Sequence, residues 1–136
     1  MPTELRVKRR VQFAETDAAG IVHFSCYFRY MEEAEHALWR AAGLSIHPPD
    51  SDLGWPRVEA ACAFHRALRF EEEFDVVIRV SELTRRTISY KCVIERQDER
   101  IATGTLKIAC VSTRRGEPMR SMEIPNEIAA RFSTEE

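Results

Sequence analysis

The sequence lacks the motifs with which several large classes of enzyme bind a nucleotide or a metal ion. It contains no G-x-x-x-x-G-K-S/T phosphate loop, no G-x-G-x-x-G turn and no G-x-S-x-G nucleophile elbow. Its 4 histidines have no metal-ligand spacing, and it has no C-x-x-C pair. We therefore expect neither a zinc centre nor a nucleotide-hydrolysing site.

Long apolar runs and a strong charge imbalance are also missing. Residues 1–20 contain no continuous apolar stretch, so no signal peptide is expected, and no later stretch is long enough to cross a bilayer. The formal net charge of -2 provides no global basic field of the kind that attracts nucleic acid. The 4 cysteines are scattered through apolar or patterned segments, as is typical of reduced, buried thiols. These features predict a cytoplasmic protein with no nucleic-acid or membrane partner.

What is present is ordinary globular composition for one domain, residues 1–136, with 44% hydrophobic and 31% charged residues. The N-terminal segment alternates, and its apolar side is Leu5, Val7, Val11 and Phe13. Arg9 is the single exception on that side. The alternation predicts a half-buried strand.

A long helix is expected from Ser25 to Ala42. Apolar residues recur there at three- and four-residue steps: Tyr27, Met31, Ala34, Leu38 and Ala41. Ser25 suits the N-cap, and Gly43 stands where helices commonly end in a left-handed residue.

The remainder is mostly strand. Alternating runs cover residues 58–65, 74–80, 88–94 and 102–110, turns are expected at 85–86 and 98–99, and a short helix at 125–132. One long helix and about five antiparallel strands predict an α+β domain whose single sheet curls round the helix. Edge strands and leftover apolar surface favour self-association.

A carboxylate stands just before the long helix. Asp17 lies in the polar, small-residue stretch 15–20, where Gly20 permits a left-handed backbone or close approach to a ligand. Unpaired N–H groups at a helix start keep a nearby carboxylate ionised, so that it can act as a nucleophile or base, and they can also bind an oxyanion. These two features together are typical of an acyl-transfer site. An Asp in this position is also common as a cap or turn residue, and composition does not decide between these roles.

The run D-A-A-G-I-V-H-F from Asp17 to Phe24, followed by Tyr27, resembles the signature of the 4-hydroxybenzoyl-CoA thioesterase family, with its YbgC-like acyl-CoA thioesterases, in the hotdog superfamily. The stretches 38–44, 55–56, 85–87 and 119–125 also resemble that family. The resemblance therefore runs nearly end to end and implies a hotdog fold.

The resemblance implies a role for each matching residue. Asp17 takes the catalytic aspartate role, Gly20 belongs to the same loop, and the backbone N–H near Phe24 polarises the thioester carbonyl. The neighbouring positions expected to line the substrate pocket are Ile21, Val22, His23 and Tyr27.

A second matching stretch implies where coenzyme A binds. The positions that correspond to a phosphate-contacting surface of the family are Arg85, Arg86, Thr87 and Ser89. Guanidinium groups pair well with phosphate oxygens, although two arginines in a solvated turn are the alternative. Coenzyme A enters as part of the substrate, so no separate cofactor and no metal are expected.

Three positions depart from the family pattern. Cys26 stands where relatives commonly have Asn, and no evident base partners it as a nucleophile. Glu15 stands where some relatives carry Asp. His23 lies one position before the histidine of the YbgC-like subgroup, whose place Phe24 takes, so pocket lining or core packing is expected of His23 rather than catalysis.

The resemblance implies hydrolysis of an acyl-CoA thioester, with an aromatic or short acyl group, to a carboxylic acid and free coenzyme A. Asp17 would act as nucleophile or general base, in a homodimer or homotetramer with a shared site. Two alternatives stay open: a hotdog enoyl-thioester hydratase or dehydratase, which usually needs a His with an acidic partner, and a non-catalytic acyl-CoA binding module.

Overall fold

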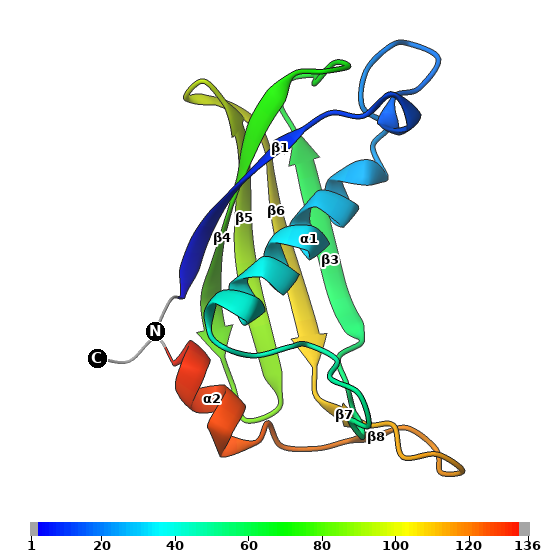
Figure 1. Cartoon of the computed structure of the whole chain (residues 1–136), viewed down its shortest axis with the longest axis vertical. Coiled ribbons are helices and arrows are strands. Elements are labelled where there is room, and N and C mark those ends of the chain that lie inside the picture. Colours follow the sequence, from blue (N-terminus) through cyan, green and yellow to red (C-terminus); the bar gives the residue numbers. More distant parts are fainter. Residues whose placement is uncertain (1–2, 134–136) are drawn as a thin grey trace.

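The computed structural model describes residues 3–133 and contains one long helix laid along a five-stranded antiparallel sheet (Figure 1). The order of strands across the sheet is β1-β4-β5-β6-β3. Their bounds are β1 Glu4–Arg10, β3 Arg57–Phe64, β4 Glu73–Leu83, β5 Thr87–Arg96 and β6 Glu99–Ala109. The helix, α1, spans Cys26–Ala41. The expected α+β architecture, a sheet curled round one long helix, is confirmed.

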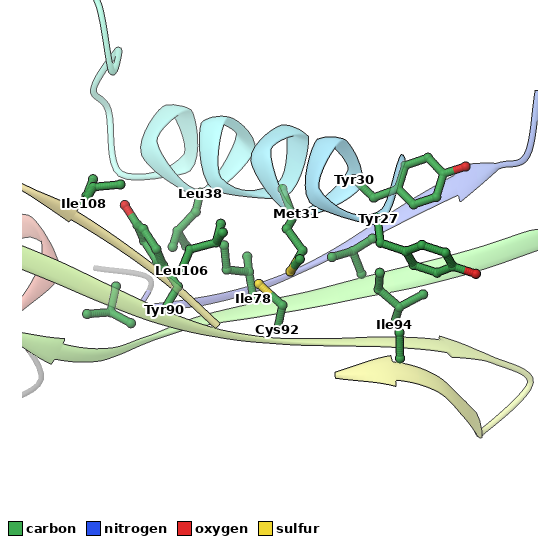
Figure 2. Close-up of a cluster of buried hydrophobic side chains, with 14 of the residues drawn as sticks. Tyr27, Tyr30, Met31, Leu38, Ile78, Tyr90, Cys92, Ile94, Leu106 and Ile108 are labelled. Atoms are coloured by element: carbon green, nitrogen blue, oxygen red, sulfur yellow. The ribbon is translucent and has the colours of Figure 1, made fainter. Parts of the chain in front are cut away.

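The core lies between α1 and the sheet. Side chains of β4 and β5 alternate, and the members that face α1 are Phe74, Val76, Ile78, Val80, Ile88, Tyr90, Cys92 and Ile94, all buried. Figure 2 shows Tyr27, Met31 and Leu38 of α1 pointing toward this face of the sheet. The apolar face that alternation gives the strands therefore packs against the apolar face that the 3.6-residue period gives the helix.

The end of α1 has a Schellman motif, as the Gly at position 43 predicts. Gly43 has a φ of 81°, its N–H donates to Arg40 O (3.0 Å), and the N–H of Leu44 donates to Trp39 O (2.9 Å). The Arg131 guanidinium donates to Ala42 O, which ties the C-terminal helix α2 (Asn126–Phe132) to this end of α1.

The start of α1 differs from the sequence prediction. Ser25 occupies the N-cap position, but its side chain makes no capping hydrogen bond. Instead Ser25 Oγ lies 2.8 Å from His23 Nδ1, and the Ser25 N–H donates to the same ring nitrogen (3.2 Å). The imidazole therefore accepts the N–H of Ser25 itself, and backbone carbonyl oxygens of His23 and Phe24 face the first N–H groups of the helix.

Two further expectations need correction. Phe13 does not continue the apolar face of β1: it begins a 3-10 turn, Phe13–Glu15, is 73% exposed, and packs edge-to-face on Phe70 at 5.7 Å. The expected turn at 98–99 is centred one residue earlier, because Gln97 and Asp98 have positive φ values (51° and 65°) and β6 already begins at Glu99.

A second, three-stranded sheet was not expected from the sequence. It consists of β2 (Leu53–Gly54), β7 (Val111–Ser112) and β8 (Arg120–Ser121) in the order β2-β7-β8. Strands of two residues are too short to show a period in the sequence. Among residues 3–133, no helix has the length and apolar character needed to span a bilayer.

Among residues 3–133, one charged residue lies wholly inside the fold. Glu35 of α1 is 0% exposed, and its carboxylate accepts hydrogen bonds from Arg57 of β3 at 2.6 and 3.2 Å. Arg57 also donates to Glu32 (2.9 Å). Beside this cluster, the indole N–H of Trp39 donates to Tyr90 Oη (2.9 Å). The ion pair with Arg57 offsets the cost of burying the charged Glu35 carboxylate, which would be strongly destabilising without it.

We predict that Arg57→Met lowers the free energy of unfolding by about 3–5 kcal/mol, because it removes the guanidinium that offsets the buried charge of Glu35. Urea denaturation measures this change. Arg6→Met is the control, since Arg6 forms its ion pairs with Asp75 and Glu95 from an exposed position and its loss should change little. Equal stability of the two variants would contradict the assignment.

Candidate active site

Asp17 begins a tight hairpin directly before α1. Its N–H donates to Ile21 O (2.8 Å), and the Gly20 N–H donates to Asp17 O (2.9 Å). Gly20 has a φ of 81°, and Thr16 and Val22 pair across the base of the hairpin. A three-residue loop of this kind combines a type I turn with a left-handed residue, which explains why glycine stands at position 20.

The Asp17 carboxylate is half-buried, and only one of its oxygens is used locally. Oδ1 accepts the N–H groups of Ala19 (2.9 Å) and Ile21 (3.3 Å), the pattern of an Asx turn. Oδ2 makes no hydrogen bond to any residue from 3 to 133. Asp17 is thus a turn residue whose Oδ1 fixes the orientation of the side chain, while Oδ2 has no partner in the described part of the chain.

The entrance to α1 leaves one backbone donor unused. The N–H of Cys26 donates to His23 O (2.9 Å), the N–H of Tyr27 points at Phe24 O (3.4 Å), and the Ser25 N–H meets the His23 ring. The N–H of Phe24 has no acceptor within the described part of the chain. Together with the helix dipole, this amide is suited to bind a carbonyl oxygen on which negative charge develops.

His23 is exposed, and its ring stacks on Phe24, with centroids 4.5 Å apart and planes at 28°. The only hydrogen-bond partner of the imidazole ring among residues 3–133 is Ser25, and no carboxylate contacts the ring. A hydratase of the kind considered above needs an acidic partner for its histidine, and this ring has none in the described structure.

The other residues expected to line the pocket divide by burial. Val22 and Tyr27 are each 3% exposed and belong to the core, whereas Ile21 is half-buried beside the hairpin. The Tyr27 ring packs edge-to-face on Phe64 of β3 (5.1 Å), which is 49% exposed. Aromatic surface therefore extends from the helix start onto the inner face of β3.

The residues expected to bind coenzyme A lie elsewhere in the chain. Arg85 and Arg86 form the β4–β5 turn and line a hollow of about 840 Å³ beside α2. Arg85 pairs with Glu123, and Arg86 donates to Ser121 Oγ (3.0 Å). Thr87 and Ser89 follow on β5, both half-buried.

This turn and the Asp17 hairpin lie at opposite ends of α1 (Figure 1). The 16 residues of α1 span roughly 24 Å at 1.5 Å per residue. One chain therefore does not bring Asp17 and Arg85 together. Another hollow, of about 550 Å³, opens on the sheet face turned away from α1, where Val77, Val93 and Thr103 line it, and it does not include Asp17.

A cluster of ionised and hydroxyl groups, not expected from the sequence, supports the hairpin. Arg9 of β1 donates to both carboxylate oxygens of Glu15 (3.0 and 2.6 Å) and to Glu33 of α1 (2.6 Å). Tyr30 Oη donates to Glu15 Oε1 (2.9 Å). The signal was present in the sequence, because Arg9 breaks the apolar alternation of its strand and so brings a charge to the inner face.

Comparison with known proteins places the chain in a family. Residues 11–132 match the model of the thioesterase-like superfamily. The chain belongs to that superfamily. A relative in Aquifex aeolicus (strain VF5), which carries a provisional name as an esterase, is 37% identical over 101 residues, covering 74% of this chain and 79% of its own.

Other relatives of this thioesterase-like protein have more specific names. A 1,4-dihydroxy-2-naphthoyl-CoA hydrolase of Synechococcus sp. (strain CC9311) is 28% identical over 133 residues, covering 91% of this chain and 86% of its own. The solved structure of a gentisyl-coenzyme A thioesterase aligns with a TM-score of 0.83 at 28% identity. The alignment covers 95% of this chain and 100% of the thioesterase chain. The predicted family and the enzyme class, a thioesterase, are confirmed.

We predict that Gly20→Ala destabilises this thioesterase-like protein by about 1–2 kcal/mol, because a side chain disfavours the left-handed backbone at that position. Space is not the obstacle, since the nearest atom to an added Cβ is Arg69 Nη1 at 3.9 Å. Thermal denaturation and a turnover assay measure the two effects.

Gly116→Ala is the matched control. Gly116 has nearly the same φ (85°) in an exposed loop with nothing within 4 Å of an added Cβ. Both variants should lose similar stability, but only Gly20→Ala should lose activity. Equal activity in the two would show that the hairpin is not part of the site.

Proposed function

We propose that this protein hydrolyses acyl-CoA thioesters to a carboxylic acid and free coenzyme A, with Asp17 as the reacting carboxylate. The observation that carries the proposal is a pair of groups at the start of α1. Asp17 Oδ2 and the Phe24 N–H have no partner within residues 3–133, and they are an acceptor and a donor held by neighbouring turns.

The Phe24 N–H would bind the thioester carbonyl oxygen and stabilise the negative charge that grows there. Asp17 Oδ2 would attack the carbonyl carbon, so that a C–O bond forms, the C–S bond breaks and coenzyme A leaves as a thiolate. Water then hydrolyses the mixed anhydride. In the other version, Asp17 takes a proton from a water that attacks the carbon directly. Both versions use water alone as co-reactant, and coenzyme A enters as part of the substrate.

The surface near Asp17 favours an aromatic or short acyl group. Phe24 is 64% and Phe64 49% exposed, and Tyr27 packs on Phe64. Exposed rings of this kind offer faces on which a planar acyl group can stack. Relatives named for 1,4-dihydroxy-2-naphthoyl-CoA and gentisyl-CoA support the same class of substrate.

The two edges of the main sheet differ in a way that supports a homodimer. The edge strand β1 carries Arg6, Lys8 and Arg10, charges of the kind that block pairing with another chain. The opposite edge strand, β3, has the sequence R-V-E-A-A-C-A-F, with Val58 52% and Phe64 49% exposed. We expect two chains to pair through β3.

The separation of Asp17 and Arg85 in one chain supports a site shared between subunits. A coenzyme A whose thioester lies at Asp17 would place its phosphates on the Arg85–Arg86 turn of another subunit. Both arginines are exposed and reach a hollow of about 840 Å³. Guanidinium groups there would bind the phosphates by charge-assisted hydrogen bonds.

We predict that Asp17→Asn lowers kcat by about three or more orders of magnitude, since the amide neither attacks the carbonyl nor takes a proton. Free thiol release from 4-hydroxybenzoyl-, gentisyl-, 1,4-dihydroxy-2-naphthoyl-, acetyl- and butyryl-CoA gives the measurement and ranks the substrates. Asp50→Asn, in an exposed loop, is the control. Addition of water to an enoyl-CoA, or binding without turnover, would point to one of the rival functions instead.

A second prediction tests the shared site by complementation. Co-expressed chains carrying Asp17→Asn and Arg85→Ala/Arg86→Ala, purified through two different tags, form mixed dimers with one intact site and one doubly altered site. Such dimers should show about half the wild-type activity at low substrate concentration, whereas each variant alone is nearly inactive. No recovery in the mixed dimers would mean that each chain supplies its own complete site.

A further inference from the structure

We infer that Glu15 is a positioning residue for the thioesterase reaction: it holds the hairpin of Asp17 and the Phe24 amide in a fixed mutual geometry. The inference rests on the proposed function, in which these two groups act on one thioester. Glu15 itself reaches neither the substrate nor the reacting atoms in this arrangement. Its contacts join three separate elements of the fold.

The Glu15 side chain is almost fully engaged. Oε1 accepts from Arg9 Nη1 (3.0 Å), the Gln12 N–H (2.8 Å) and Tyr30 Oη (2.9 Å), and Oε2 accepts from Arg9 Nη2 (2.6 Å). Only 17% of the side chain is exposed. The two Arg9 contacts form a bidentate pair, the geometry that restricts a carboxylate most strongly.

The Glu15 backbone connects the two halves of the candidate site. Its carbonyl oxygen accepts the His23 N–H at 2.8 Å and the Cys26 thiol at 3.7 Å. His23 directly precedes Phe24, and Glu15 lies two residues before Asp17. A rotation of the Glu15 peptide would therefore move the Asp17 carboxylate and the Phe24 amide relative to each other.

Arg9 extends this support to α1. Its guanidinium donates to Glu33 at 2.6 Å and 3.3 Å and lies 4.7 Å from the centroid of the Tyr30 ring. Burial raises the pKa of Glu15, but hydrogen bonds from Arg9, the Gln12 N–H and Tyr30 outweigh it, and the net pKa lies below the ordinary value. The carboxylate is charged at neutral pH, so the cluster is intact under the conditions of an assay.

A purely structural ion pair and a positioning residue have different effects on kinetics. Loss of a structural pair lowers stability, but the protein that remains folded turns over normally. Loss of positioning leaves substrate binding intact and slows the chemical step, since a misplacement of about 1 Å at a reacting group can cost about 100-fold in rate. The ratio of the effect on kcat to that on KM separates the two roles.

The test is Glu15→Gln, assayed with the best substrate of the acyl-CoA panel. The amide NH2 cannot accept the Arg9 Nη2–H that Oε2 now accepts, so the bidentate pair is lost at almost constant volume. We expect kcat to fall by about 10- to 100-fold while KM changes by less than about threefold. An unchanged kcat, or a loss confined to KM, overturns the inference.

Asp75→Asn is the matched control. This change also converts a carboxylate paired with an arginine into an amide, since Arg6 Nη1 lies 2.9 Å from Asp75 Oδ2, but on the sheet face turned away from α1. We expect its kcat to stay within about twofold of wild type. A loss equal to that of Glu15→Gln would show a general effect of ion-pair removal and would also overturn the inference.

Tyr30→Phe provides a second route to the same measurement if Glu15→Gln does not fold. It removes one hydrogen bond to Glu15 Oε1 and keeps the ring that packs on Phe74. We expect a fall in kcat of about 3- to 10-fold at constant KM. Full kcat in Tyr30→Phe overturns the inference even when Glu15→Gln is insoluble.

Asp17→Asn distinguishes failure of this inference from failure of the proposed function. Activity that survives Asp17→Asn removes the proposed reaction, and with it any group for Glu15 to position. Activity that is lost in Asp17→Asn but kept in Glu15→Gln leaves the reaction in place and overturns only the role of Glu15.

Discussion

A single long helix covers the apolar face of the main sheet, and the position of this helix determines where the other parts of the molecule lie. Every turn of α1 contributes a side chain to the core, so the helix cannot rotate or slide without exposing apolar surface. Its two ends are therefore fixed in space. One end receives the Asp17 hairpin, and the other is closed by Gly43 and held by α2.

Two arginines tie this helix to the two edges of the sheet. Arg9 projects from the edge strand β1 to Glu33, and Arg57 projects from the opposite edge strand β3 to Glu32 and Glu35. An edge strand has a neighbour on one side only, so contacts to the helix replace part of what the missing strand would supply. The β1 contact also includes Glu15, and in this way a fold-stabilising cluster reaches the start of the candidate site.

The predictable parts of this fold are those in which one period dominates the sequence. Alternation along β4 and β5, and the three- and four-residue steps in α1, located these elements because each has one buried face. The prediction that Phe13 lies on the apolar face of β1 was wrong because the chain leaves the sheet at Val11, and periodicity does not mark where a strand ends. The Asp17 turn was visible as a short motif, whereas the contact of Arg9 with Glu33 joins residues 24 positions apart that only the folded chain brings together. The coenzyme A-binding role of the Arg85–Arg86 turn stays a prediction, because in one chain this turn lies at the far end of α1 from Asp17.

Three of the four cysteines have a consequence for an enzyme of this kind. Burial raises the pKa of the Cys92 thiol to about 12 and also raises the pKa values of Cys62 and Cys110. These sulfur atoms are protonated at neutral pH, and only a thiolate attacks a disulfide. An acyl-CoA hydrolase liberates a thiol at each turnover, and oxidising surroundings convert that thiol to its disulfide. These three sulfur atoms are poorly disposed to form mixed disulfides with the compound that the reaction sets free, so the accumulating product has little means of modifying the catalyst at these positions.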